Sequence, residues 1–380
     1  MILIKKVLKI VLVVFLVFCV LFTATGVGLI ATNYNNLGHF IESYFLIENF
    51  FLWPPETDAL IEGMIDGMVL GLDDKYSRYF SPEEFKSFKE SFQGIYGGIG
   101  IYADFVDDMV VVVSTMKDSP GEKAGLLEGD AIIGVNGESV SGKSINEIVA
   151  LIKGEPDTEV TLTVKRNENE VFDVSIIRKY IDNPTVYTEM LTESPEFGYV
   201  QIAGFSQKTY PEFLEEMNEL LAQGPKGLII DLRGNPGGEL EAIVNVTGSF
   251  IPEGPVIHQV DNKGEIKSIV TSGNTLDMPI VVLTNGGTAS AAEAMTGALQ
   301  DNGVAYVIGT KTFGKGIVQT IFPLGNGGGL ELTTHKYLTA GKRDIHEVGI
   351  TPDLVVELTS EDTYDKQLEA AIDYLKEKTK

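Results

Sequence analysis

The stretch from Pro279 to Leu299 constrains the fold most, because it joins a strand to a helix through one short polar turn. Pro279–Leu283 is an apolar run rich in β-branched residues, with the length of a buried strand. It stops at a glycine-bearing turn that ends in Ser290, and strong helix formers follow. Such a turn exposes a hydroxyl beside a helix N-terminus, where free backbone N–H groups can stabilise an oxyanion. Ser290 is therefore a candidate nucleophile, and a helix cap is the alternative.

A second strand ends in a similar way earlier in the chain. Gly227–Leu232 has the pattern of a buried strand, the loop 233–238 follows it, and residues 239–249 return to a helical pattern. Strands and helices in this succession predict a layered α/β core, whose ligands bind at the carboxyl ends of the strands. We therefore expect the loops 233–238 and 284–290 to meet at one site.

The amino terminus carries a targeting signal. Lys5, Lys6 and Lys9 precede residues 10–31, a stretch without a charged residue. About twenty such residues span a bilayer as a helix, and the flanking positive charges keep that end in the cytoplasm. This pattern predicts a single-pass anchor in the cell membrane, with the remainder outside the cytoplasm. Secretion after signal-peptide cleavage is the alternative, because small residues lie near 23–26 and at Ala31.

Charge and composition exclude several classes of function. The formal net charge of −25 argues against a nucleic-acid partner, because no basic excess offsets phosphate repulsion. A lone cysteine, Cys19, excludes an internal disulfide framework and a multi-cysteine metal site. The sequence has four histidines, at His39, His258, His335 and His346. No pair of them has the spacing of a zinc-binding helix, so no metal site is predicted.

Residues 32–95 are predicted to be helical. Apolar residues recur at three- and four-residue spacings before and after Pro54-Pro55, and Ser81 followed by Pro82 is typical of a helix start. No chemistry is apparent in this region, which suggests packing or pairing of two copies of the chain. A helical pattern at 364–378 closes the sequence.

Residues 96–181 have a strand-rich pattern that includes a family signature. Ser119–Asp130, followed by Val135-Asn136-Gly137, resembles the central signature of a PDZ domain. The resemblance implies a groove in which an extended C-terminal peptide adds its backbone to a sheet edge. Gly98, Ile99, Gly100 and Ile101 match the loop that receives the terminal carboxylate in that family, and ordinary β-turn glycines are the alternative.

Two other kinds of active site fit the sequence less well. Residues 309–315 have the spacing of a phosphate-binding loop, but Gly316 follows where serine or threonine should bind magnesium, so we reject nucleotide binding. A Ser–His–Asp triad would need His335 or His346 as the base. Neither histidine lies in a motif typical of a catalytic base, and Ser290 is not part of a G-x-S-x-G motif. A histidine base is kept as an alternative.

A serine–lysine dyad is the stronger hypothesis. Lysine can take a proton from serine only when it is neutral near pH 7, which burial in apolar surroundings achieves. Lys315 fits because Phe313 and Ile317 flank it and no acid lies in the segment. Gln319 follows four residues later, where its amide can orient the lysine. A surface lysine in a glycine loop is the alternative.

Three motifs together carry a resemblance to one protease family. Residues 231–238, 285–293 and 313–319 resemble the C-terminal processing proteases, which are tail-specific serine endopeptidases, and the match extends to Gly71–Tyr79. The resemblance implies that no cofactor takes part. It assigns the catalytic residues as follows: Ser290 is the nucleophile, Lys315 the general base, Gln319 its orienting partner, and the N–H groups of Ala291 and Gly238 the oxyanion hole. Ala292 departs from the family's usual serine, which we expect to alter packing only.

The resulting prediction is a multidomain α+β protein. Its parts are an anchor or signal segment (1–31), a helical region (32–95), an inserted PDZ domain (96–181), a mixed α/β serine protease core of the ClpP and crotonase type (182–355), and a C-terminal helix (356–380). It would act on proteins or peptides with free C-terminal tails. A catalytically silent PDZ adaptor is the alternative function; an acyl hydrolase on a similar core would leave the PDZ segment unexplained.

Overall fold

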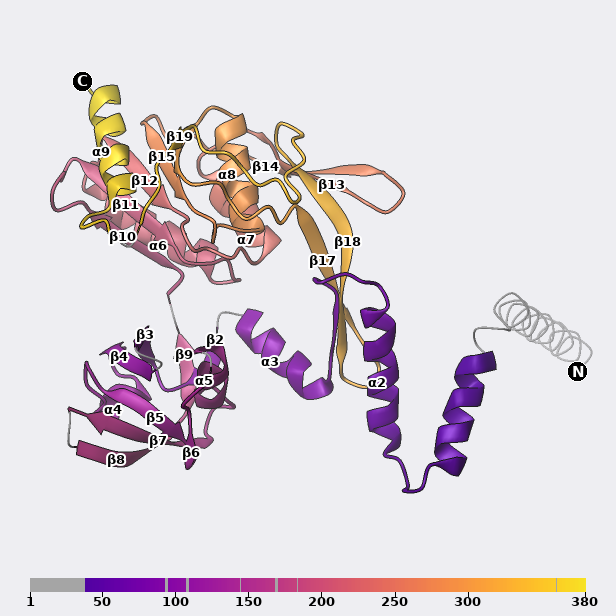
Figure 1. Ribbon diagram of the computed structural model, residues 1–380. Helices are drawn as coiled ribbons and strands as arrows, with labels where there is room; N and C mark the ends of the chain where they lie inside the picture. The colour runs from indigo at the N-terminus through magenta and orange to yellow at the C-terminus, as the bar shows by residue number, and fades with distance from the viewer. Residues whose placement is uncertain are drawn as a thin grey trace, which may run out of the picture. The chain divides into compact units, whose positions relative to one another are not determined.

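The computed structural model describes residues 38–92, 95–106, 109–143, 145–167, 170–182, 184–359 and 361–380. The chain divides into two compact units, one ending at Asp73 and the other beginning at Asp74 (Figure 1). The apolar segment 10–31 lies outside the described residues, and none of the helices within those residues has the length and apolar character needed to cross a membrane.

The described part of the first unit, from residue 38 onward, contains two helices, as the sequence predicts. Residues 38–50 form one helix and α2 (Thr57–Leu70) the other, with the Pro54-Pro55 pair between them. Both helices leave large apolar side chains exposed to solvent, as does the chain that follows each of them: Phe40, Ile41, Phe45, Leu46, Ile47, Phe50, Phe51, Leu52, Trp53, Ile61, Met68, Leu70 and Leu72. Exposed apolar side chains in such numbers mark an interaction surface.

The α/β core predicted for residues 182–355 is built on one six-stranded sheet. The strand order is β10 (Val186–Met190), β11 (Phe197–Ile202), β12 (Gly227–Asp231), β15 (Ile280–Thr284), β16 (Ala305–Gly309) and β19 (Leu354–Val355). From β11 to β19 all neighbours are parallel, and β10 pairs antiparallel with β11. The parallel order follows from the alternation of strand and helix that the sequence shows.

Both faces of this sheet are buried, because helices cover each of them. Leu228 and Ile230 join one apolar core with α6 (Thr209–Ala222), α7 (Leu240–Gly248) and α8 (Ala291–Asp301). Ile229 and Val281 join a second core with α9 (Lys366–Lys378), drawn in yellow in Figure 1. A strand covered on both faces is apolar throughout, which explains the continuous runs in the sequence.

A second sheet of five strands lies in the same unit, and one of its strands falls within residues 32–95, where the sequence predicts helices alone; that part of the prediction is wrong. Its strands are β1 (Arg78–Phe80), β13 (Gly254–Val260), β14 (Ile266–Thr271), β17 (Ile317–Pro323) and β18 (Gly329–Thr339). The long β18 pairs with β1, β13 and β17. After β1, Ser81 caps the next helix, α3 (Pro82–Phe92): the Glu84 N–H donates to Ser81 Oγ over 3.3 Å, as predicted for a helix start here.

Residues 95–182 form a β-rich module with its own apolar core. One sheet has the order β3 (Ile101–Val106), β4 (Met109–Thr115), β5 (Ala131–Val135), β7 (Glu159–Arg166) and β8 (Glu170–Ile177), with β6 (Glu138–Ser139) beside β5. β2 (Ile95–Gly98) pairs with β9 (Lys179–Asp182), and two short helices, α4 (Pro120–Lys123) and α5 (Ile145–Ile152), complete the module. β3 is an edge strand, so one of its backbone edges is open to a further strand.

Candidate active site

Ser290 lies in a sharp turn between β15 and α8. Its backbone has φ 53° and ψ −117°, a conformation that costs a non-glycine residue about 1–3 kcal/mol. The side chain is half-buried, and Tyr337 Oη–H donates to the Ser290 carbonyl oxygen over 2.7 Å. Burial and the neighbouring Glu293 charge raise the pKa of Tyr337. A strained turn that is held in this way is typical of a residue presented for chemistry.

The two predicted loops meet at Ser290. An added Cβ on Gly237 would lie 2.8 Å from the Ser290 Cβ and 2.8 Å from the Ala291 nitrogen, so only glycine fits there. The Ala289 N–H donates to the Asn235 carbonyl oxygen over 2.9 Å. The loops 233–238 and 284–290 therefore lie in contact, and their joint role in one site stays a prediction.

The predicted oxyanion donors lie on these loops. Ala291 is the first residue of α8, where a backbone N–H has no carbonyl partner within the helix. Gly238 has φ 140° and is bridged to Phe205; an added Cβ would lie 1.9 Å from the Phe205 carbonyl oxygen. Glycine is thus required at 238 for the backbone path, and the role of both N–H groups stays a prediction.

A buried carboxylate links the Ser290 turn to the Lys315 loop. Glu293, fully buried in α8, accepts from the Ser290 N–H at 2.9 Å and the Lys315 N–H at 2.8 Å, both on Oε2. Its Oε1 accepts from the Gly314 N–H at 2.7 Å and from Thr312 Oγ1–H at 2.5 Å. All four partners are donors, so the carboxylate fixes the backbone of Ser290 relative to that of Lys315.

The Lys315 side chain lies against an aromatic ring. Its Nζ is 4.9 Å from the centre of the Tyr76 ring, and no hydrogen bond joins it to Ser290 among the described residues. Burial lowers the pKa of Lys315; Glu331 and Asp74 oppose the shift, while Arg78 supports it. A lowered pKa is what a lysine base needs, but the Ser290–Lys315 hydrogen bond is not formed in this structure.

Gln319 lies on β17, across from Thr333 on β18. Its Nε2 donates to Thr333 Oγ1 over 3.3 Å, and the strand register shifts between Val318 and Gln319. A shift of this kind redirects side chains locally. Gln319 lies four residues after Lys315 in the same segment of the chain. Its role in orienting the lysine stays a prediction.

Neither histidine of the alternative triad is hydrogen-bonded to Ser290 in the described part of the chain. His335 Nδ1 lies 2.9 Å from Thr334 Oγ1. His346 Nδ1 is buried without a hydrogen-bond partner in the described part of the chain, and no hydrogen bond there joins either histidine to Ser290. Within the described residues no group of three acidic, histidine or cysteine side chains is arranged to hold a metal ion.

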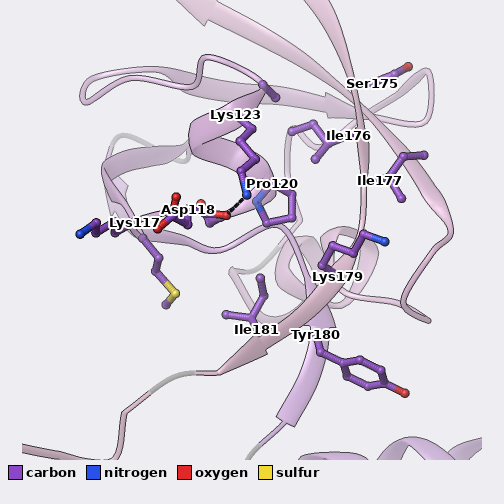
Figure 2. Close-up of a pocket in the computed structure, with 13 residues that line it drawn as sticks. Lys117, Asp118, Pro120, Lys123, Ser175, Ile176, Ile177, Lys179, Tyr180 and Ile181 are labelled. Atoms are coloured by element: carbon purple, nitrogen blue, oxygen red, sulfur yellow. Dashed lines mark hydrogen bonds between the residues drawn. The ribbon is translucent and has the colours of Figure 1, made fainter.

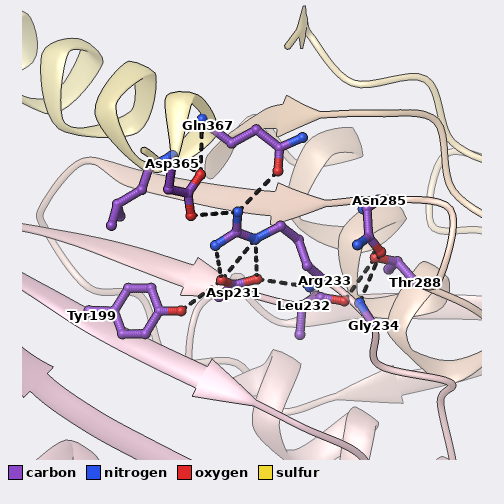
Figure 3. A network of polar contacts seen from close by, with 10 residues as sticks. Tyr199, Asp231, Leu232, Arg233, Gly234, Asn285, Thr288, Asp365 and Gln367 are labelled. Atoms are coloured by element: carbon purple, nitrogen blue, oxygen red, sulfur yellow. Dashed lines mark hydrogen bonds and ion pairs between the residues drawn. The ribbon is translucent and has the colours of Figure 1, made fainter. Parts of the chain in front are cut away.

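A charged network anchors the start of the 233–238 loop (Figure 3). Asp231, buried at the end of β12, accepts from Tyr199 Oη–H at 2.7 Å and from Arg233. Arg233 also binds Asp365 at 2.8 Å and Gln367 at 3.1 Å, at the start of α9. Burial and the Asp231 charge raise the pKa of Tyr199, which keeps it a donor. The C-terminal helix thereby holds the base of the loop that approaches Ser290.

The β-rich module contains a groove where the sequence predicts one. A cavity of about 270 Å³ is lined by Gly98, Ile99, Gly100 and Ile101 on one side and by Val149, Ile152 and Lys153 of α5 and its end on the other. All four predicted tail-binding residues thus border one space beside the open strand β3. Their contact with a peptide stays a prediction.

A second cavity lies elsewhere on this module (Figure 2). It has a volume of about 550 Å³, lies between α4 and the segment 175–181, and shares only Met116 with the groove. Lys123 Nζ donates to the Asp118 carbonyl oxygen at its rim over 2.5 Å.

Sequence reasoning missed two residues of the site. Glu293 had a usable signal, because Ser290-Ala291-Ala292-Glu293 has the spacing of a capping box, although the pattern does not show that the carboxylate also holds Lys315. Tyr76 lies within the Gly71–Tyr79 part of the resemblance, but no role could be assigned to it, because its contact with Lys315 depends on the pairing of β1 with β18.

Comparisons with known proteins agree with the fold and the motifs. The profile of peptidase family S41 matches residues 196–356, and that of the PDZ domain matches residues 111–166. The carboxy-terminal processing protease CtpA of Bacillus subtilis is 41% identical over 319 residues, which is 83% of this chain and 68% of that protein. The carboxy-terminal-processing protease of Bartonella bacilliformis is 37% identical over 86% of this chain and 76% of its own length.

Solved structures give the same result. The photosystem II D1 C-terminal processing protease superposes with a TM-score of 0.55 at 28% sequence identity, over 90% of this chain and 92% of that one. The predicted α+β class, with an S41 core, a PDZ domain and terminal helices, is confirmed. The chain belongs to the carboxy-terminal processing serine proteases of peptidase family S41.

Proposed function

We propose that this protease cleaves C-terminal tails with a Ser290–Lys315 dyad, through an acyl-enzyme. The observation that carries the proposal is the Glu293 carboxylate, which accepts from the backbone N–H groups of both Ser290 and Lys315. A carboxylate buried between two loops fixes the distance between their backbones, which is what a two-residue catalytic unit requires.

Each group has a defined step. Neutral Lys315 Nζ takes the Ser290 proton as Oγ attacks the scissile carbonyl, and the N–H groups of Ala291 and Gly238 stabilise the resulting oxyanion. The lysine then gives that proton to the leaving amine, and the acyl-enzyme forms. Water, deprotonated by the same lysine, attacks the ester, and the lysine returns that proton to Ser290 Oγ as the new C-terminus is released. Gln319 orients the amine through its amide.

The rate of Ser290 acylation should rise with pH. Burial lowers the pKa of Lys315, so the neutral base appears below the usual lysine range, near 10.4. Labelling by a serine-directed phosphonate, followed by intact mass, should accelerate with pH and level off below that range. A flat profile from mildly acidic to alkaline pH would count against a lysine base, and absence of labelling would favour the silent adaptor.

The PDZ groove is proposed to receive the substrate's C-terminal tail. β3 offers an open edge, and the Gly98–Ile101 segment places backbone N–H groups beside a cavity of about 270 Å³. An extended peptide would pair with β3, with its last side chain in the cavity and its carboxylate at the glycines.

A charge placed in this groove should weaken tail binding by about tenfold or more, because it repels the terminal carboxylate. Val149→Glu introduces it at a half-buried groove position, and Ala150→Glu adds the same charge on the exposed face of α5 as a matched control. Fluorescence polarisation on Ser290→Ala protein would compare a labelled peptide with its C-terminal amide. Equal affinity for acid and amide, or equal effects of both variants, would refute tail recognition at this groove.

Membrane attachment and extracytoplasmic action are proposed from Lys5, Lys6 and Lys9 and the uncharged segment 10–31. The full chain, expressed in a bacterium, should sediment with membranes, resist alkaline carbonate extraction and be digested by protease added to spheroplasts. A shortened, released product would instead support signal-peptide cleavage.

Pairing of two copies through the first unit is proposed from its exposed apolar side chains, which include Phe50, Leu52 and Trp53. Burial of such a surface against its own copy removes apolar area from water, which favours association.

A further inference from the structure

One motif of the sequence has no part in the mechanism above. The segment Gly71–Tyr79 belongs to the family resemblance, yet none of its residues is assigned a step. From Asp74 onward it lies in the same unit as the protease core, and the β1 strand that it leads into pairs with β18: Arg78 faces Glu331 and Phe80 faces Gly329. β17, which contains Gln319 and begins two residues after Lys315, also pairs with β18. The segment therefore lies near both residues.

The first contact is with Lys315. Its Nζ lies 4.9 Å from the centre of the half-buried Tyr76 ring, within the range of a cation–π interaction. Three other charges act on the amine: Glu331 and Asp74, which favour its ammonium form, and Arg78, which disfavours it. Arg78 and Glu331 are themselves paired at 2.7 Å, so they offset each other in part.

The second contact is with Gln319, through a chain of hydrogen bonds. Ser77 Oγ–H donates to Asp74 Oδ2 at 2.6 Å, and Ser77 Oγ accepts from the Thr333 N–H at 3.0 Å. Thr333 Oγ1 in turn accepts from Gln319 Nε2 at 3.3 Å. Burial raises the pKa of Asp74, but hydrogen bonds from Ser77 and Thr333 lower it by more. The net pKa lies below the usual value, so the carboxylate stays charged. The turn 74–77 thus contacts Lys315 directly and Gln319 through Thr333.

We propose that the turn Asp74–Ser77 positions the general base: Tyr76 holds the Lys315 ammonium away from Ser290 in the substrate-free enzyme, while Ser77 and Thr333 hold Gln319 in place. This proposal rests on the proposed role of Lys315. An aromatic face stabilises an ammonium ion but not a neutral amine. The ring therefore opposes the effect of burial and holds the lysine charged until it turns toward Ser290. Tyr76 is a positioning residue that sets how much neutral base is present at a given pH.

The direct test measures Lys315 itself. Trace labelling of the full chain with acetic anhydride from pH 6 to 11, read on the Lys315 peptide by mass spectrometry, gives the midpoint at which this amine becomes neutral. Tyr76→Leu removes the ring and keeps an apolar side chain, so it should lower the midpoint by about half to one pH unit. Tyr76→Phe keeps the ring and should leave the midpoint unchanged. Tyr79→Leu, the same change three residues along the chain, is the matched control.

A second readout follows the reaction. Phosphonate labelling of Ser290 at pH 7 should be roughly three- to tenfold faster in Tyr76→Leu, as expected for that shift, and should approach the parent rate at alkaline pH. A merely structural role would slow labelling at every pH. Should Tyr76→Leu fail to fold, pentafluorophenylalanine in place of Tyr76 keeps the ring's shape but removes its negative face, and should give the same shift.

An unchanged Lys315 midpoint in Tyr76→Leu or the fluorinated protein, or an equal shift in Tyr79→Leu, would overturn the inference. Failure of the dyad has a different pattern: Lys315→Ala would be labelled at Ser290 as fast as the parent. The acetylation midpoint does not depend on activity, so the two failures are told apart.

Discussion

Ser290→Ala is expected to lower the turnover of an unstructured protein substrate by at least about 10⁴-fold, to the level of background hydrolysis. The substitution removes only the attacking oxygen, and loss of a nucleophile in a serine protease has an effect of this size. Lys315→Ala should give a comparable loss, because a serine hydroxyl without a base is a poor nucleophile. The measurement is release of new C-termini from a fluorescent substrate, with circular dichroism to show that the variants are folded.

The double variant provides the control. Residues that act as one unit are not additive, so Ser290→Ala combined with Lys315→Ala should be no slower than either alone. Lys311→Ala, at an exposed position in the same loop, should retain the parent rate. Full activity in Ser290→Ala would refute the nucleophile. Full activity in Lys315→Ala would refute the lysine base and bring back His335 or His346.

Glu293→Gln is expected to lower kcat by about a hundredfold or more while KM changes little. The carboxylate accepts four hydrogen bonds, whereas an amide has one carbonyl oxygen and presents its own N–H donors to the remaining donors. Each buried donor left unpaired costs about 1–3 kcal/mol, and relaxation of the loops would separate Ser290 from Lys315. A displacement of about 1 Å is enough for a hundredfold loss.

Thr312→Val gives the graded comparison. It keeps the shape of the buried side chain, removes one of the donors to Glu293, and leaves the direct bonds to Ser290 and Lys315 intact. We expect a smaller loss of kcat than for Glu293→Gln. Rates are measured well below each variant's melting temperature. A parent-like kcat in folded Glu293→Gln protein would show that the carboxylate serves stability only.

Many local features could be predicted from the sequence. The expected strand, turn and helix around Ser290 are confirmed as β15, ending at Thr284, and α8, beginning at Ala291. The helical pattern at 239–249 is α7 (Leu240–Gly248), one residue shorter at each end. The S41 and PDZ resemblances are confirmed by the comparisons. The catalytic roles, the domain boundaries and the membrane anchor stay predictions.

The sequence by itself determined which residues are candidates, because hydrophobic periodicity and turn chemistry are properties of neighbouring residues. Only the tertiary structure decided which groups meet. Glu293 joins Ser290 to Lys315, and Tyr76 lies against the lysine, because α8 packs beside the lysine loop and β1 pairs with β18. Contacts between segments so distant in the chain arise from sheet pairing and loop closure, which leave no local pattern in the sequence.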